Sequence, residues 1–169
     1  LYEVLLTKKI KGKYIIYDVD STYWDDFMRN TYVRSSQMRY EIADEFTNAE
    51  GKLSYKVDIF HRNSSSESFR PVEVMYVTPS ETDLKVNQQN LTFIKLIFPV
   101  SEDRTWDGNA LVPRFDQDYT AEYGNTNGWL YQYKNVGKPH DVGNNYFANT
   151  ITVNQIDEQL NDPDVDTTS

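Results

Sequence analysis

The chain has 169 residues, of which 17 are basic and 26 acidic, so its formal net charge is −9 at pH 7. This length fits one domain, and the acidic balance argues against a nucleic-acid partner because the surface repels phosphates. Cysteine is absent, which excludes disulfides, thiol catalysis and thiolate metal sites. The 13 Tyr, 8 Phe and 3 Trp supply enough buriable surface for a core. We therefore expect a single β-rich domain over residues 1–169, with residues 161–169 as a polar tail or loop.

Alternation of apolar and polar residues is the clearest pattern in the first third of the chain. Residues 13–19 include β-branched and aromatic residues at both odd and even positions, which predicts a strand that is covered on both sides or lies at a barrel seam. Residues 37–42 and 53–59 then alternate with period two around a polar loop that ends in Gly51. This arrangement predicts an antiparallel hairpin with one solvated face.

The middle of the chain predicts two strands separated by a short helix. Residues 72–77 form the first strand candidate. Thr78 can cap a helix, Pro79 suits its first position and Glu81 can reach back, so a helix is predicted over residues 79–86. Residues 91–100 are apolar on both faces apart from one lysine, which predicts a central strand that ends at its proline.

Turn formers divide the remaining residues into further short strands. Gly-rich and Asn-rich turns occur near residues 107–109, 124–128, 137–139 and 143–145, and residues 129–136 and 146–156 between them are strand-like. The pattern predicts an all-β fold, mainly an antiparallel curved sheet, as a partly open barrel or a sandwich, with at most one short helix near residues 79–86.

One short motif suggests a hydrolase. Asp18 and Asp20 follow an apolar strand and precede Thr22, as in phosphatases of the haloacid dehalogenase type, where the first Asp is the nucleophile and the second a general acid. That chemistry also requires Mg²⁺, a downstream Lys and strand–helix alternation, which the pattern does not predict. The alternative is a strand that runs into an acidic turn.

Three clusters of acidic residues are candidate calcium sites, because carboxylates at alternate positions can surround Ca²⁺. Solvated loop charge explains the same clusters. His61 and His140 show no zinc spacing and no local pairing with a nucleophile. We therefore predict no metal and no cofactor. The clusters are Asp18/Asp20/Asp25/Asp26, Asp116/Asp118 and Asp162/Asp164/Asp166.

The aromatic residues offer a different kind of candidate site. Exposed rings stack on sugars while neighbouring polar side chains bind hydroxyl groups, so such residues can hold glycans or peptides. The alternative is that these rings fill a core that has few leucines, and Trp106 in particular has the setting of a packed turn. The candidates for ligand binding are Trp24, Trp106, Trp129, Tyr131 and Tyr133.

Four segments of the chain carry a resemblance: residues 12–22, the hairpin over residues 39–62, residues 90–100 and residues 105–110. Together, in order and spacing, they resemble a family of exported lipoproteins of Bacteroidota. The resemblance spans most of residues 12–157. It implies an all-β fold, export past the inner membrane, and a lipid anchor on an N-terminal cysteine that precedes the present first residue. The family has no known activity, so the resemblance supplies no catalytic residues.

These observations lead to three functional expectations. The first is a non-catalytic exported protein, periplasmic or at the cell surface, that acts as a binding or accessory subunit with a protein partner at the outer membrane and reaches the membrane only through its anchor. The second is a glycan- or peptide-binding module that uses the aromatic candidates. The third is a hydrolase that uses Asp18 and Asp20.

Overall fold

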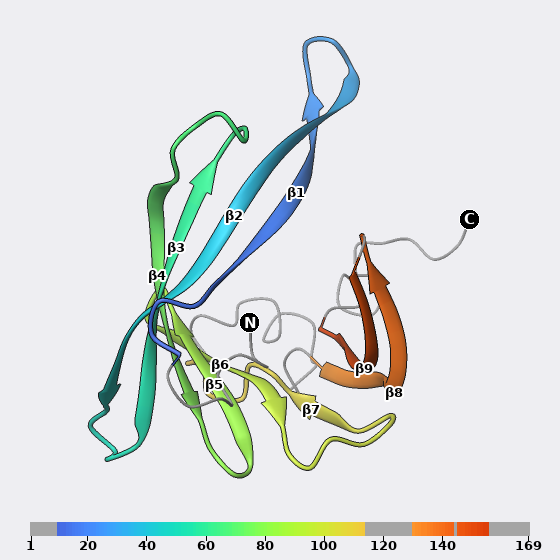
Figure 1. The fold of residues 1–169 in the computed structure, drawn as a ribbon. Coiled ribbons are helices and arrows are strands. Elements are labelled where there is room, and N and C mark those ends of the chain that lie inside the picture. Colours follow the sequence, from blue (N-terminus) through green and yellow to red (C-terminus); the bar gives the residue numbers. More distant parts are fainter. Residues whose placement is uncertain (1–9, 114–129, 144, 156–169) are drawn as a thin grey trace. The chain divides into compact units, whose positions relative to one another are not determined.

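A computed structural model of the chain describes residues 10–113, 130–143 and 145–155, and all secondary structure in these ranges is β. The predicted all-β class is therefore confirmed, and the strand pairings within each part of the chain are antiparallel. No helix in the described ranges is suited to crossing a membrane. The strands are β1 (Tyr14–Asp25), β2 (Asn30–Thr47), β3 (Leu53–Arg62), β4 (Arg70–Pro79), β5 (Asp83–Gln88), β6 (Leu91–Ile97), β7 (Thr105–Asp107), β8 (Leu130–Val142) and β9 (Asn145–Asn154) (Figure 1).

The chain divides into two compact units, the first ending at Thr78 and the second beginning at Pro79. In the first unit the strand order follows the sequence from β1 to β4. The predicted hairpin is confirmed, since Tyr40 lies opposite Ile59 and Ile42 lies opposite Val57. Facing residues of paired strands share one face of a sheet. That face forms the core of the first unit, which consists mainly of Ile42, Tyr55, Val57, Ile59, Met75 and Val77.

The first strand is more exposed than its composition predicted. Tyr14, Ile16 and Tyr17 are all exposed, so the expectation of a strand covered on both sides is wrong. β1 is the first strand of its sheet and, among the described strands, pairs with β2 alone, so it lacks a second neighbour. In addition, β2 pairs with β3 only from Gln37 onward, whereas it pairs with β1 from Asn30. Residues 19–36 therefore form a two-stranded ribbon that extends beyond the third strand, as the long twisted arm of Figure 1 shows.

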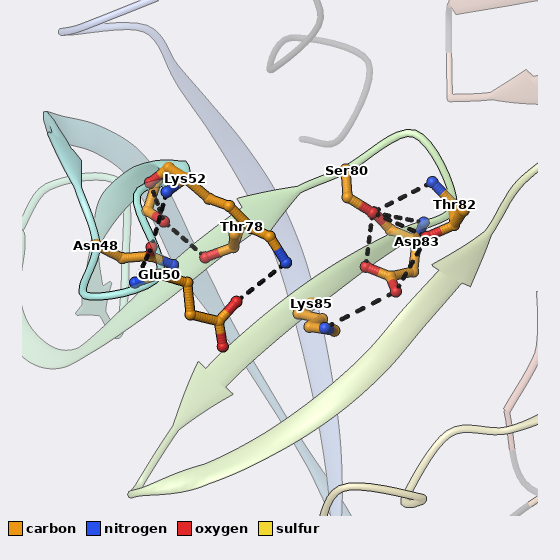
Figure 2. A network of polar contacts seen from close by, with 9 residues as sticks. Asn48, Glu50, Lys52, Thr78, Ser80, Thr82, Asp83 and Lys85 are labelled. Atoms are coloured by element: carbon orange, nitrogen blue, oxygen red, sulfur yellow. Dashed lines mark hydrogen bonds and ion pairs between the residues drawn. The ribbon is translucent and has the colours of Figure 1, made fainter.

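The prediction of a short helix over residues 79–86 is also wrong. The Ser80 hydroxyl accepts hydrogen bonds from the backbone N–H groups of Thr82 (3.2 Å) and Asp83 (2.9 Å), which forms a tight turn (Figure 2). Such side-chain bonds offer the backbone an alternative to a helix. From Leu84 the residues alternate with period two, and Leu84 and Val86 are buried in β5.

A second polar turn in Figure 2 joins β2 to β3 and lies within the predicted polar loop. The Asn48 side-chain oxygen accepts from the backbone N–H groups of Glu50 (3.0 Å) and Lys52 (2.9 Å). Lys52 also forms an ion pair with Glu50 at 3.0 Å. The buried Ser54 shares a 2.7 Å hydroxyl–hydroxyl bond with Thr78, which links the start of β3 to β4. These bonds fix the register of the hairpin whose inner face forms the core.

In the second unit, β5 pairs with β6, and β7, β8 and β9 form a small sheet in that order. The strand predicted over residues 91–100 exists and stops at Ile97, before Pro99. It is the last strand of its sheet rather than a central one. Its backbone is hydrogen-bonded to the side chains of Trp106 and Tyr133 instead of to a further strand at these positions.

The last two strands confirm the strand predictions near residues 129–136 and 146–156. The turn predicted at residues 137–139 is wrong, because β8 continues through it. The pairing with β9 shifts between Lys134 and Lys138, and Gly137 adopts a left-handed φ of 73° there. The shift in register accommodates the glycine, so the strand continues past it. Trp129, the turns near residues 124–128 and the polar residues 161–169 lie outside the described residues.

Candidate functional site

Three of the five aromatic candidates are buried together in the second unit. The Trp106 ring lies 5.6 Å from that of Tyr131 and 4.6 Å from that of Tyr133, measured between ring centroids. All three side chains are more than nine-tenths buried. Gly108 lies against this cluster so closely that a Cβ atom there would be 2.5 Å from Tyr131 Cζ. The faces of these rings are thus occupied by protein.

Hydrogen bonds attach the same rings to strand β6. Trp106 Nε1 donates to the carbonyl of Ile94 at 2.8 Å. The Tyr133 hydroxyl donates to the carbonyl of Ile97 (2.7 Å) and accepts from its N–H (2.9 Å). These bonds occupy backbone groups that an end strand would otherwise leave unpaired. Trp106 and Tyr133 therefore stabilise the second unit rather than offer a surface to a ligand.

Burial also shifts the pKa values of ionisable side chains in this cluster. Desolvation raises the pKa of Tyr131 and of Tyr133. Desolvation lowers the pKa of Lys95, whose ammonium donates a 3.2 Å hydrogen bond to the Tyr131 hydroxyl. All three shifts follow from removing a charged form from water.

Trp24 is the one described aromatic candidate that remains accessible, with 60% of its surface exposed. It lies at the end of β1, beside the loop that joins β1 to β2. In that loop Phe27 is 94% exposed and Met28 is 70% exposed. We call Trp24, Phe27, Met28 and Val33 the tip of the β1–β2 hairpin; all four are large, apolar and exposed.

Acidic side chains hold the tip in one conformation. Asp25 Oδ1 accepts hydrogen bonds from the backbone N–H groups of Phe27 and Met28, each at 2.9 Å. Asp26 accepts from Trp24 Nε1 at 2.8 Å. This is the bonding of an Asx turn, in which a side chain replaces a backbone acceptor. Phe27 and Met28 are therefore presented to solvent by a hydrogen-bonded turn.

The two carboxylates of the hydrolase hypothesis lie on one face of β1. Asp18 accepts a 2.7 Å hydrogen bond from Gln37, and Asp20 accepts a 2.6 Å bond from Ser35. Both partners belong to β2, so each carboxylate serves as a cross-strand contact of the ribbon. Across the described residues, no group of three or more His, Asp or Glu side chains is placed to hold a metal ion. The acidic clusters at residues 116–118 and 162–166 fall in the parts of the chain that are not described.

A polar pocket of about 490 Å³ opens on the opposite face of the ribbon. Its lining includes Ser21, Tyr23, Arg34, Ser36 and His61. Ser21 faces Arg34, Tyr23 faces Tyr32, and Met38 faces His61, so the pocket lies on the same sheet face as the core of the first unit. We call it the Arg34 pocket. His140, the other histidine, lies far along the sequence in β8, opposite Phe147.

The sequence offered only weak signals for the tip and the pocket. Phe27 and Met28 are flanked by the turn formers Asp25 and Asn30, which is the one local sign that they occupy a loop. The pocket residues are separated by 13 positions between Ser21 and Arg34 and by a further 27 to His61. No short motif could reveal such a set. The strand register is what brings it together.

Comparison with known proteins adds no further constraint on the site. No protein-family model, curated protein or solved structure matches this chain.

Proposed function

We propose that this protein is a non-catalytic, exported β-protein that acts as a binding or accessory subunit at the bacterial outer membrane, and that the tip of the β1–β2 hairpin contacts its protein partner. The observation that carries the binding role is the tip itself. Large exposed apolar groups that lie together mark interaction sites in soluble proteins. Aromatic residues and Met are also the types enriched at protein interfaces.

The shape of the hairpin supports this role. Residues 19–36 extend beyond the third strand, so their side chains are accessible from several directions. The bonds from Asp25 order the loop before any partner arrives. A binding loop that is already ordered loses less conformational entropy on association.

A protein partner fits the tip better than a lipid surface does. Asp25 and Asp26 lie directly beside Phe27 and Met28, and the whole chain carries a net charge of −9. Anionic headgroups would repel these carboxylates, and insertion of the tip into a bilayer would require their desolvation. A protein can instead cover Phe27 and leave the acidic groups at the rim of the interface. Export and the outer-membrane location rest on the lipoprotein resemblance of the sequence.

Site-specific photocross-linking in the cell envelope tests this proposal. A photoreactive phenylalanine at Phe27 is expected to give one discrete protein adduct. The same probe at Val72, which is 55% exposed on β4 of the same unit, is the matched control and should give none. Lipid adducts alone, or equal adducts from both positions, would rule out the tip as a protein-binding site.

A further inference from the structure

The Arg34 pocket contains polar groups that the protein itself leaves available. Arg34 forms no hydrogen bond or ion pair with another described residue; its guanidinium carbon lies 5.7 Å and 5.4 Å from the ring centroids of Tyr23 and Tyr32. The side chains of Ser21, Ser36 and His61 are likewise without a hydrogen-bond partner within the described ranges, although each is half-buried. Four adjacent side chains can therefore bind a ligand directly.

The charge of this pocket differs from that of the chain as a whole. Its lining contains Arg34 and no carboxylate. Asp18 and Asp20, the nearest acidic residues on β1, alternate onto the other face, where Gln37 and Ser35 donate hydrogen bonds to them. Two lining residues contact carboxylates at the edge of the pocket: Ser35 that of Asp20 and Asn63 that of Glu67. An arginine presents five N–H donors in a planar fork that matches a carboxylate or a sulfate. Arg34 is exposed, so the two-point geometry of such a pair rather than exclusion of water would provide its strength.

The remaining groups point to a carbohydrate as the carrier of that anion. The Tyr23 ring is 45% exposed and is held in place by stacking on Tyr32, with centroids 5.5 Å apart and planes at 21°. A fixed aromatic face packs against the C–H surface of a sugar ring, and hydroxyl and imidazole groups bind its hydroxyls. A pocket of about 490 Å³ falls in the usual range for small-ligand sites. Its serine-rich lining suits a polyhydroxylated ligand better than apolar peptide side chains.

We infer that the Arg34 pocket is a binding site for an acidic carbohydrate unit, a sugar ring that carries a carboxylate or a sulfate. Arg34 binds the anionic group, Tyr23 packs against the ring, and Ser21, Ser36 and His61 bind its hydroxyls. This site is separate from the tip, and its occupancy does not depend on the proposed protein partner.

Calorimetric titration of the full chain tests the inference with three saccharide probes and with tetraglutamate, an acidic peptide control. Tetragalacturonate carries carboxylates, its methyl ester has the same rings without charge, and a heparin tetrasaccharide carries sulfates as well as carboxylates. Binding of either acidic sugar, at least tenfold tighter than binding of the ester, is expected. The two acidic arms differ in whether sulfate is present. Failure of both acidic sugars to bind, equal binding of the ester, or tighter binding of tetraglutamate would overturn the inference.

Substitutions then assign the binding to this pocket. Arg34→Gln is expected to weaken binding at least tenfold, and Ser21→Ala to weaken it to a smaller degree without disturbing the ribbon. Arg29→Gln removes a charge from the same hairpin outside the pocket and should leave binding unchanged. Unaltered affinity in both pocket variants would place the ligand elsewhere. Because these titrations use purified protein, they succeed or fail independently of cross-linking in the envelope.

Discussion

The tip of the β1–β2 hairpin and the buried cluster of Trp106, Tyr131 and Tyr133 both contain large aromatic residues but place them in opposite environments. In the second unit, Trp106, Tyr131 and Tyr133 are buried, and Trp106 and Tyr133 bond to the backbone of β6. At the tip, Trp24 and Phe27 are exposed, and the polar bonds come from neighbouring aspartates. The aromatic residues of this chain therefore occupy two kinds of environment. One group of rings stabilises the fold, and the other is exposed to solvent.

Truncation of Tyr133 is expected to give the largest difference between the two regions. Tyr133→Ala removes a fully buried ring and both of its hydrogen bonds to Ile97, so the free energy of unfolding should fall by about 3–5 kcal/mol. Tyr23→Ala removes a half-exposed ring from the ribbon and should cost less than half as much. Urea unfolding measures both. Equal losses would show that the ribbon ring is as structural as the buried one.

Addition of one methyl group at Gly108 tests how tightly the same cluster is packed. The new Cβ would lie 2.5 Å from Tyr131 Cζ, so Gly108→Ala should destabilise the protein by about 1–3 kcal/mol. Combining it with Tyr131→Leu should recover part of the loss, because the two changes share one contact. If the two losses are simply additive, the close approach of Gly108 to the ring is not what holds the cluster.

The pH dependence of stability should show the buried groups. The pKa values of Tyr131 and Tyr133 are raised above 10.0, so the folded state retains protons that the unfolded state loses, and stability should fall as pH rises beyond 10.0. Tyr17 and Tyr40 of the first unit shift in the same direction. The pKa of Lys95 is lowered from 10.5, so the unfolded state binds more protons and stability should rise as pH approaches 10.5. Lys95→Met should therefore flatten the rising part of the plot of unfolding free energy against pH, measured by urea unfolding from about pH 7 to about pH 11. A profile identical to that of the unmodified chain would contradict the burial of this lysine.

The smallest effect on stability is expected at the tip. Phe27→Ser changes a side chain that is 94% exposed and whose backbone N–H bonds to Asp25 rather than to the sheet. The free energy of unfolding should change by less than about 0.5 kcal/mol. Thermal unfolding followed by circular dichroism measures it. A larger loss would mean that Phe27 packs against the protein and has a structural role.

The fold could be predicted from the sequence where alternation with period two dominated. Leu53, Tyr55 and Val57 alternate with polar residues, and this pattern predicted the hairpin of β2 and β3 and its solvated face. The helix over residues 79–86 failed because Ser80 caps a turn by bonding to Thr82 and Asp83, and the same residue types also cap helices. Local preference alone could not separate these two outcomes.

The candidate sites were much harder to predict from the sequence. Trp24 and Trp106 are the same residue type, but Trp106 is buried and hydrogen-bonded to β6, whereas Trp24 is exposed. The Arg34 pocket depends on the register of three strands, which places Ser36 and His61 on one face. Such long-range pairings follow from the whole sheet and have no short sequence signature.

The most direct test of the division between structural and recognition aromatics is quantitative capture from detergent-solubilised envelopes. Tagged full-length protein is compared with a Phe27→Ser, Met28→Ser double variant after cross-linking and mass spectrometry. A stoichiometric partner is expected to accompany the unmodified protein and to fall at least tenfold in the variant, while the variant keeps its unfolding midpoint. Recovery of the same partner at the same yield from a folded variant would contradict the role of the tip in recognition.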